Sequence, residues 1–264
     1  MASYHFSVKS GRKGKATDHA TYIAREGKHE KDDKATDLVF KKHGNLPAWA
    51  NDNPMIFWNA ADRNERANGS VYREFEIALP SELTDQQNIE LVKDLVKSQV
   101  GDKPYLLAVH APDASLGSGK QPHLHVMFSD RKPDGINRSP ELHFKRFNRN
   151  NPETGGCKKD SGGKDRYILR EELISCRESV AQIENAHLEK HGHAVRVDHR
   201  SNKDRGIAQD PERHLGQSGV KKFTEEDKVA LQAERKVKGT ALAKDMQATQ
   251  MEGPIGADGT ADQI

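Results

Sequence analysis

The order of hydrophobic patterns between residues 70 and 129 constrains the fold of this chain more than any other feature. Residues 70–79 alternate apolar and polar side chains, while 104–110 and 121–129 are short and largely apolar, so all three are predicted to be β-strands. After the first strand, Thr84 and Gln87 form a capping-box pattern ahead of an apolar stripe with helical spacing. A strand, a long helix and two adjacent strands favour an α/β or α+β sandwich with an antiparallel centre. Of the two we predict the α+β class, with an antiparallel central sheet flanked by helices.

The remainder of the chain divides into shorter regular segments and one long basic stretch. Residues 130–165 are rich in Gly, Asn, Lys and Arg and are predicted to form a long, mobile, basic loop. We expect one domain over residues 1–220 and a tail over 221–264 that passes from polar helix-forming sequence into flexible, disordered sequence. Further predicted elements are a strand at 4–8 and helices at 16–29, 52–68 and 167–190.

Several function classes are excluded or disfavoured by what the sequence lacks. Cys157 and Cys176 are the only cysteines, which is too few for a disulfide scaffold and not the spacing of a CxxC metal site. No GxxxxGK[ST] loop is present, so nucleotide-driven chemistry is not supported. Neither a signal peptide nor a membrane span is visible, and we expect a soluble cytoplasmic protein without membrane insertion.

Lysine and arginine gather in two places, although the formal net charge of the 264-residue chain is only +2. Basic patches of this kind are what contacts to DNA phosphates need, but a solvated charged surface would look the same in the sequence. Both interpretations stay open at this stage. The candidate DNA-binding residues are Lys9, Arg12, Lys13, Arg25 and Lys28 near the N-terminus, and Arg131, Arg138, Lys145 and Arg146 in the basic loop.

Three histidines are the candidate metal ligands. His123 and His125 are two positions apart on a predicted strand, so their side chains point to the same face while Leu124 and Val126 point to the other. His110 ends the preceding predicted strand and would lie close if the two strands pair. Three neutral imidazoles leave coordination positions open for phosphate oxygens and water. A His–x–His pair on a strand is also common in proteins where the histidines only pack.

Glu74 and Glu76 share one face of the predicted strand at 70–79. Paired carboxylates there could orient a ligating histidine, take up a proton or bind metal directly. A solvated strand face would explain the same pattern.

Tyr22 lies in the predicted N-terminal helix, with Arg25 three residues further on the same helical face. A tyrosine hydroxyl has an unperturbed pKa near ~10, so its use as a nucleophile needs help from cations, a metal or a base. Taken alone, Tyr22 would be assigned to packing. Together with the histidine cluster and the basic flanks, it completes a set of residues suited to phosphoryl transfer.

These residues carry a resemblance to a known family. QPHLHVMFSDR resembles the histidine motif of the MobA/MobL mobilisation proteins, whose relaxase domain is a branch of the HUH endonucleases (U is a hydrophobic residue). The opening YHFSVKSGRKGK with YIAREGKH, the segment WNAADRNERANGSVYREFEIALPSEL and the closing VDHRSNKDRGIAQDPERHLG are also similar to the family pattern. The four segments follow in the family's order over residues 1–216.

The resemblance implies more than the residue patterns do. It implies an HUH-type sandwich in which Tyr22 is the nucleophile, His110, His123 and His125 hold a divalent metal ion (Mg²⁺ or Mn²⁺), and Glu74 and Glu76 form the acidic strand. Such proteins nick one strand at a plasmid transfer origin, form a 5′-phosphotyrosyl link and later rejoin the ends. Expected partners are single-stranded and hairpin DNA at that origin, with accessory mobilisation proteins and a type IV coupling protein.

Two other functions remain as alternatives. A rolling-circle replication initiator or transposase-like nickase would use the same chemistry, but such initiators place their tyrosine after the histidine motif, whereas Tyr22 precedes it. A non-catalytic DNA-binding module would use the histidines for a structural zinc ion or for packing. Closed zinc sites usually have four protein ligands, often including cysteine, and no cysteine lies near these histidines.

Overall fold

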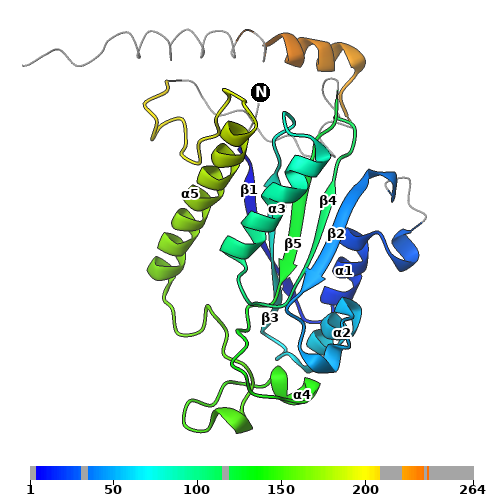
Figure 1. Cartoon of the computed structure of the whole chain (residues 1–264), viewed down its shortest axis with the longest axis vertical. Coiled ribbons are helices and arrows are strands. Elements are labelled where there is room, and N and C mark those ends of the chain that lie inside the picture. Colours follow the sequence, from blue (N-terminus) through cyan, green and yellow to red (C-terminus); the bar gives the residue numbers. More distant parts are fainter. Residues whose placement is uncertain (1–3, 31–34, 115–118, 209–221, 235–236, 238–264) are drawn as a thin grey trace, which may run out of the picture. The chain divides into compact units, whose positions relative to one another are not determined.

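The computed structural model describes residues 4–30, 35–114, 119–208, 222–234 and 237 (Figure 1). The chain forms two compact units, one of residues 1–113 with 120–210 and one of 114–119 with 211–264. The second unit contributes a helix at residues 225–234, whose first turn is capped by the Thr224 hydroxyl. Most of the predicted tail, and residues 209–216 of the family-like closing segment, lie outside the described residues.

The first unit is built on a five-stranded sheet in the order β1-β3-β5-β4-β2, in which every neighbouring pair is antiparallel. The predicted α+β class with an antiparallel central sheet is therefore confirmed. The strand that carries His123 and His125 lies at the centre, between the strand with the two glutamates and the strand that ends at His110. The strands are β1 (Phe6–Arg12), β2 (Leu38–Gly44), β3 (Ser70–Ala78), β4 (Tyr105–His110) and β5 (His123–Phe128).

Helices cover both faces of this sheet (Figure 1). On one face α1 and α2 contact each other over a core that includes Trp58 and Met127. On the other face α3 and α5 pack over Phe75, Leu107 and Val126. The helices are α1 (Ala16–Ala24), α2 (Pro54–Asn64), α3 (Asp85–Gln99), α4 (Pro140–His143) and α5 (Arg166–Lys190), with 3₁₀ turns at Gly27–His29, Ala35–Asp37, Ala48–Ala50 and Pro152–Thr154.

Helix starts follow local sequence signals. The capping box predicted at Thr84 is present, since Thr84 Oγ1 accepts from the Gln87 amide and the Gln87 side chain accepts from the Thr84 amide. The side chain of Asn53 caps α2, which begins at Pro54, and Asp165 caps α5. Within the described residues no helix is long and apolar enough to cross a membrane.

Two strands differ from the sequence prediction. β1 continues through Gly11 and Arg12, which were expected to lie in a loop. Gly11 pairs with Tyr72, and a Cβ at this glycine would lie 1.9 Å from the Tyr72 ring, so only glycine lets the aromatic ring cover the strand. β2 was not predicted; it forms the edge of the sheet by pairing with the fully buried β4.

The segment 130–165 is not the open loop that its composition suggested. It contains α4 and a 3₁₀ turn, and two of its four arginines, Arg131 and Arg138, are buried. Arg131 pairs with Glu65, while Arg138 pairs with Asp134 and donates to main-chain carbonyl groups. Both were predicted to contact DNA, and this is corrected: their guanidinium groups hold the segment together from inside.

Burial of Glu184 on α5 gives a testable pH dependence. Its Oε1 has no hydrogen-bond partner among the described residues, and burial raises its pKa from 4.5 to about 8. Above pH 4.5 the unfolded chain releases this proton while the folded chain keeps it, so stability is lost as the pH rises towards 8. Replacing the group with an apolar side chain of similar length should remove that loss.

We therefore expect Glu184→Met to be more stable than the wild type near pH 7, by on the order of 2 kcal/mol, and to gain little near pH 4.5. Urea unfolding at several pH values measures this, with Glu178→Gln on the exposed side of α5 as a control. Parallel stability–pH curves for the wild type and Glu184→Met would contradict the prediction.

Candidate active site

The three histidines gather on the face of the sheet that carries α1. In the strand register His110 lies opposite His123, and His125 lies opposite Glu76. The imidazole ring centres are 5.1 Å apart for His123 and His125, 5.5 Å for His110 and His125, and 5.7 Å for His110 and His123. The structure therefore brings the three predicted ligands together in one cluster.

Two of these histidines each have one ring nitrogen without a hydrogen-bond partner among the described residues. His125 Nδ1 lies 2.6 Å from Glu74 Oε1, and His123 Nδ1 lies 3.0 Å from the Gln121 carbonyl oxygen. Because both partners accept hydrogen bonds, each Nδ1 carries the proton, which leaves the lone pair on Nε2 when the ring is neutral. Burial lowers the pKa of His123 to about 4, so that this ring is neutral at pH 7. Each of these two rings therefore has a nitrogen that could ligate a metal ion.

His110 is oriented differently. Its Nδ1 lies 2.8 Å from Asp37 Oδ1 and its Nε2 lies 2.9 Å from the Ile23 carbonyl oxygen. Burial lowers the pKa of His110, and a neutral ring can donate to only one of the two acceptors. The carboxylate is the stronger acceptor, so the contact with Ile23 is the one that a metal ion would replace. In keeping with this orientation, the described ranges contain no group of three or more His, Cys, Asp or Glu side chains already arranged to hold a metal ion.

The two glutamates have different environments. Glu74 is buried and bridges two imidazoles, through its Oε1 to His125 and through its Oε2 to His19 Nε2 at 2.9 Å. Burial acts to raise the pKa of Glu74, but the hydrogen bonds from His125 and His19 outweigh it and lower the pKa to about 2. Glu76 is partly exposed and forms an ion pair with Lys9. Glu74 therefore orients histidines, whereas Glu76 holds a lysine beside the cluster.

Tyr22 lies at the exposed edge of this arrangement, with 36% of its surface exposed. Its ring stacks on that of His19 at a centre-to-centre distance of 6.4 Å and meets His29 edge-on at 5.3 Å. The Arg25 guanidinium lies 4.8 Å from the centre of the Tyr22 ring. A chain of contacts thus runs from Tyr22 through His19 and Glu74 to His125.

Two carboxylates fix the helix that carries Tyr22. Asp62 on α2 caps α1 from outside, accepting from the amides of Gly14 at 2.8 Å, Ala16 at 3.0 Å and Thr17 at 2.9 Å. At the other end Arg25 adopts a left-handed conformation (φ 53°) and pairs with Asp37. Because Asp37 also contacts His110, it joins the end of α1 to the histidine cluster.

Three residues of this site were missed by sequence reasoning: His19, Asp37 and Asp62. His19 lies three residues before Tyr22, so the helical spacing that selected Arg25 could have found it. Nothing near Asp37 or Asp62 in the sequence indicates a role. Both act on residues that reach them only through the tertiary fold.

The predicted DNA-binding residues near the N-terminus separate into two groups. Arg25 is buried against Asp37, so its predicted DNA contact is corrected to a structural role at the end of α1. Lys9 and Lys28 are exposed and form ion pairs with Glu76 and Asp18. Four further candidates are exposed and form no ion pair within the part of the chain that the structure describes: Arg12, Lys13, Lys145 and Arg146.

An antiparallel sheet with a His–Leu–His strand at its centre, next to a tyrosine on a flanking helix, has the features of the HUH class that the sequence resembles. The model of the MobA/MobL family matches residues 15–224, which is most of the chain. The chain belongs to the MobA/MobL family of mobilisation proteins.

Similar proteins carry corresponding names. The chain is 50% identical over 208 residues to a 43 kDa relaxation protein from Salmonella typhimurium, covering 78% of this chain and 56% of that protein. It is 38% identical to mobilization protein A from Escherichia coli, covering 83% of this chain and 30% of that protein. The chain thus spans about half the length, or less, of these curated relatives.

A solved structure that concerns the molecular basis of vancomycin resistance transfer in Staphylococcus aureus has a similar fold. It superposes with a TM-score of 0.55 and 25% sequence identity, covering 76% of this chain and all of that chain.

Proposed function

We propose that this chain is a relaxase, which nicks one strand of plasmid transfer-origin DNA through Tyr22 and later religates it during mobilisation. The observation that carries the proposal is the contact chain from Tyr22 through His19 and Glu74 to His125, beside His123 and His110. These contacts gather a phenol, an ionised carboxylate and four imidazoles on one face of the sheet. Membership of the MobA/MobL family supports mobilisation rather than replication initiation as the context.

In the proposed reaction the Tyr22 oxygen attacks the phosphorus of one phosphodiester. The phenol gives up its proton, a bond forms between its oxygen and phosphorus, the bond from phosphorus to the 3′ oxygen breaks, and the 3′ oxygen takes up a proton. Arg25 and Lys9 place positive charge near the phenol, where it would attract the negatively charged phosphate. Because the phosphotyrosine retains the ester bond, the reverse attack by a 3′-hydroxyl rejoins the strand without a further energy source.

The proposed cofactor is a divalent metal ion, Mg²⁺ or Mn²⁺, held by His110, His123 and His125. Such an ion neutralises charge on the non-bridging phosphate oxygens when bound. An all-imidazole donor set is softer than Mg²⁺ usually accepts, so Mn²⁺ is the better match of the two. Glu74 and Asp37 would orient two of the ligands from behind, as carboxylates commonly do for metal-bound histidines.

The proposed partners are single-stranded and hairpin DNA at a transfer origin, in the cytoplasm where plasmid DNA resides. Exposed Lys9, Arg12, Lys13 and Lys28 near Tyr22 in the sequence, with Lys145 and Arg146, are the candidates for phosphate contacts. Further proposed partners, on the family resemblance alone, are accessory mobilisation proteins and a type IV coupling protein.

Covalent capture tests the proposal directly. The protein is incubated with Mn²⁺ or Mg²⁺ and the single-stranded transfer origin of its plasmid, digested with nuclease and protease, and analysed by mass spectrometry. We expect the peptide that contains Tyr22 to carry a nucleotide on the phenol oxygen. Binding of the strand without any adduct would favour the non-catalytic module, and an adduct on another residue would contradict the assignment of Tyr22.

A further inference from the structure

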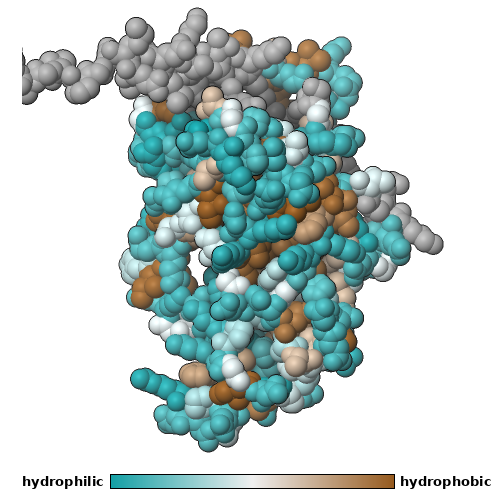
Figure 2. Space-filling view, viewed as in Figure 1, coloured by the Kyte–Doolittle hydropathy of each residue, from teal (hydrophilic) through white to brown (hydrophobic). Residues whose placement is uncertain are grey.

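A cavity of about 810 Å³ lies on the face of the sheet opposite the histidines, beneath the N-terminal half of α5. Figure 2 shows this hollow beside the N-terminal end of α5. Its walls include the apolar side chains Val8, Phe75, Phe128 and Leu173, from β1, β3, β5 and α5. We call it the α5 cavity. The volume lies within the range of about 300–1,000 Å³ that is typical of ligand sites.

The α5 cavity carries a surplus of positive charge. Its lining includes three carboxylates, Asp130, Asp160 and Glu172, against six cationic side chains. Asp160 alone forms ion pairs with three lysines, with distances of 2.8–3.2 Å from the lysine nitrogens to its carboxylate oxygens. Glu172 pairs with one of the same lysines. The cationic side chains are Arg73, Lys103, Lys132, Lys164, Arg166 and Arg170.

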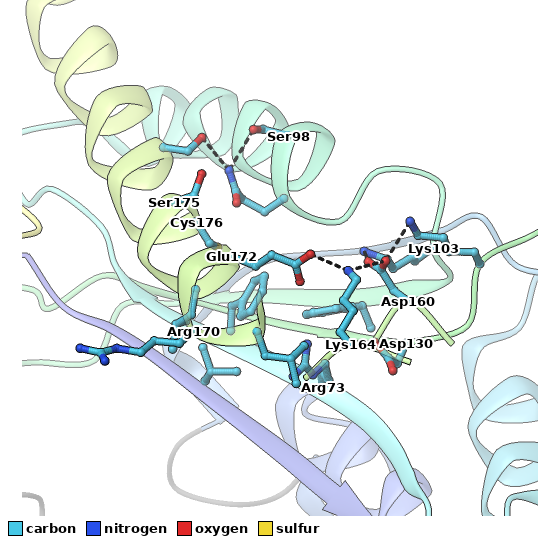
Figure 3. Close-up of a pocket in the computed structure, with 18 of the residues that line it drawn as sticks. Arg73, Ser98, Lys103, Asp130, Asp160, Lys164, Arg170, Glu172, Ser175 and Cys176 are labelled. Carbon is cyan, nitrogen blue, oxygen red and sulfur yellow. Dashed lines mark hydrogen bonds and ion pairs between the residues drawn. The ribbon is translucent and has the colours of Figure 1, made fainter. Parts of the chain in front are cut away.

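Each lysine of the cavity pairs with a carboxylate, and the arginines do not. Figure 3 shows Lys164 between Glu172 and Asp160, whereas no ion pair reaches Arg73 or Arg170. Among the described residues Arg73, Arg166 and Arg170 have no carboxylate partner, and Arg166 donates only to the Tyr167 hydroxyl. Arginines left without acidic partners beside a cavity are suited to bind an anion from solution, and phosphate in particular.

An exposed aromatic ring lies beside one of these cationic side chains. Tyr167 at the start of α5 has 62% of its surface exposed, and the Arg166 guanidinium lies 4.8 Å from the centre of its ring. Ile168 beside it is 46% exposed. Proteins bind single-stranded nucleic acid by combining cationic side chains along its phosphate backbone with an exposed aromatic ring on which a base stacks.

This cavity is separate from the candidate active site. Arg73 and Phe75 point to the opposite face of β3 from Glu74 and Glu76. Along β5, Phe128 lies five residues from His123, a distance of about 16 Å at ~3.3 Å per residue. Nucleotides bound near Tyr22 therefore cannot be the ones that fill the α5 cavity.

We propose that the α5 cavity is a second DNA site, which holds a single-stranded stretch of the substrate away from the nick. Its phosphates contact Arg73, Arg166 and Arg170, and one base stacks on Tyr167. The inference rests on the proposed function in that DNA is taken as the substrate. The exposed Tyr167 favours nucleic acid over an acidic peptide, because a base supplies the flat face that such a peptide lacks.

The first test compares affinities for a fluorescent oligothymidylate of about 30 nucleotides by anisotropy over a range of salt concentrations. Arg73→Gln combined with Arg170→Gln should weaken binding by at least about tenfold. The slope of log affinity against log salt should fall by about 1.4, because each lost phosphate contact removes about 0.7. The control loses the same charge at exposed positions outside the cavity, through Lys42→Gln combined with Lys93→Gln, and should retain the wild-type affinity.

A second variant separates the loss of a DNA contact from a loss of folding. Tyr167→Ala removes an exposed ring that the core does not need, and it should weaken binding by about fivefold or more with little change in the salt slope. Wild-type affinity and slope in both the arginine and the tyrosine variants would overturn the proposal. Equal competition by polyglutamate of the same charge would also overturn it, in favour of an acidic protein partner.

The outcome is separable from that of the proposed function. Covalent capture by the wild-type protein decides whether the chain is a relaxase, and the affinities of the cavity variants decide whether the α5 cavity binds DNA. If the wild-type protein forms the Tyr22 adduct and the cavity variants bind DNA normally, only the proposed second DNA site is contradicted. If the wild-type protein forms no adduct and the cavity variants lose affinity for DNA, only the proposed relaxase function is contradicted.

Discussion

Tyr22→Phe is expected to abolish covalent capture of single-stranded DNA while leaving the affinity for the strand nearly unchanged. The variant keeps the ring that stacks on His19 and lies against Arg25, and loses only the oxygen that would attack phosphorus. Removing a covalent nucleophile elsewhere lowers turnover by about 10⁶-fold, so the adduct should fall below detection. A strand labelled at its 3′ end reports this, since the labelled fragment stays with the protein in a denaturing gel.

Tyr105→Phe is the matched control for this experiment. It also removes one phenol oxygen, but Tyr105 lies on β4 opposite Phe128, on the other face of the sheet from the histidines. Capture by Tyr105→Phe should equal that of the wild type. If Tyr22→Phe still formed an adduct, the nucleophile would have to be another residue, and the contact chain through His19 and Glu74 would need another explanation.

The features that sequence could predict are those that depend on local periodicity. The alternation in β3 and β5 put the two glutamates on one face and His123 and His125 on one face, because side chains in a strand alternate strictly. Sequence could not separate the roles of Glu74 and Glu76. Glu76 is directly opposite His125, yet the diagonal neighbour Glu74 makes the hydrogen bond, which depends on register and side-chain direction.

Features that depend on contacts between distant segments were beyond sequence reasoning. The Asp37 carboxylate reaches His110, and the Asp62 carboxylate reaches the start of α1, only after the sheet and α2 have formed. The basic residues show the same limit. Counting charges cannot distinguish Lys145, which is exposed, from Arg131, which is buried among carbonyl groups 14 and 26 residues away along the chain.

Removal of the Glu65 carboxylate is expected to have the largest effect on stability. Glu65 and Arg131 have side-chain exposures of 1% and 3%, and their closest approach is 2.9 Å. Lys159 lies 3.2 Å from the same Glu65 oxygen. Glu65→Gln keeps the volume but leaves two cations without a counter-charge, and breaking a buried pair in this way costs about 3–5 kcal/mol. The midpoint of urea unfolding should fall accordingly with an unchanged slope.

Glu90→Gln provides the control, because Glu90 pairs with Lys190 on the surface, where solvent screens the ion pair, and its loss should leave the midpoint in place. A double variant then separates two sources of the Glu65 effect. Glu65→Leu combined with Arg131→Met removes the charge imbalance. It also removes the hydrogen-bond donors of the carbonyl oxygens of Phe144, Lys145 and Cys157. If the hydrogen bonds from Arg131 to these carbonyl oxygens stabilise the 130–165 segment, the double variant stays destabilised. Recovery to wild-type stability would show that charge balance alone accounts for the effect of Glu65.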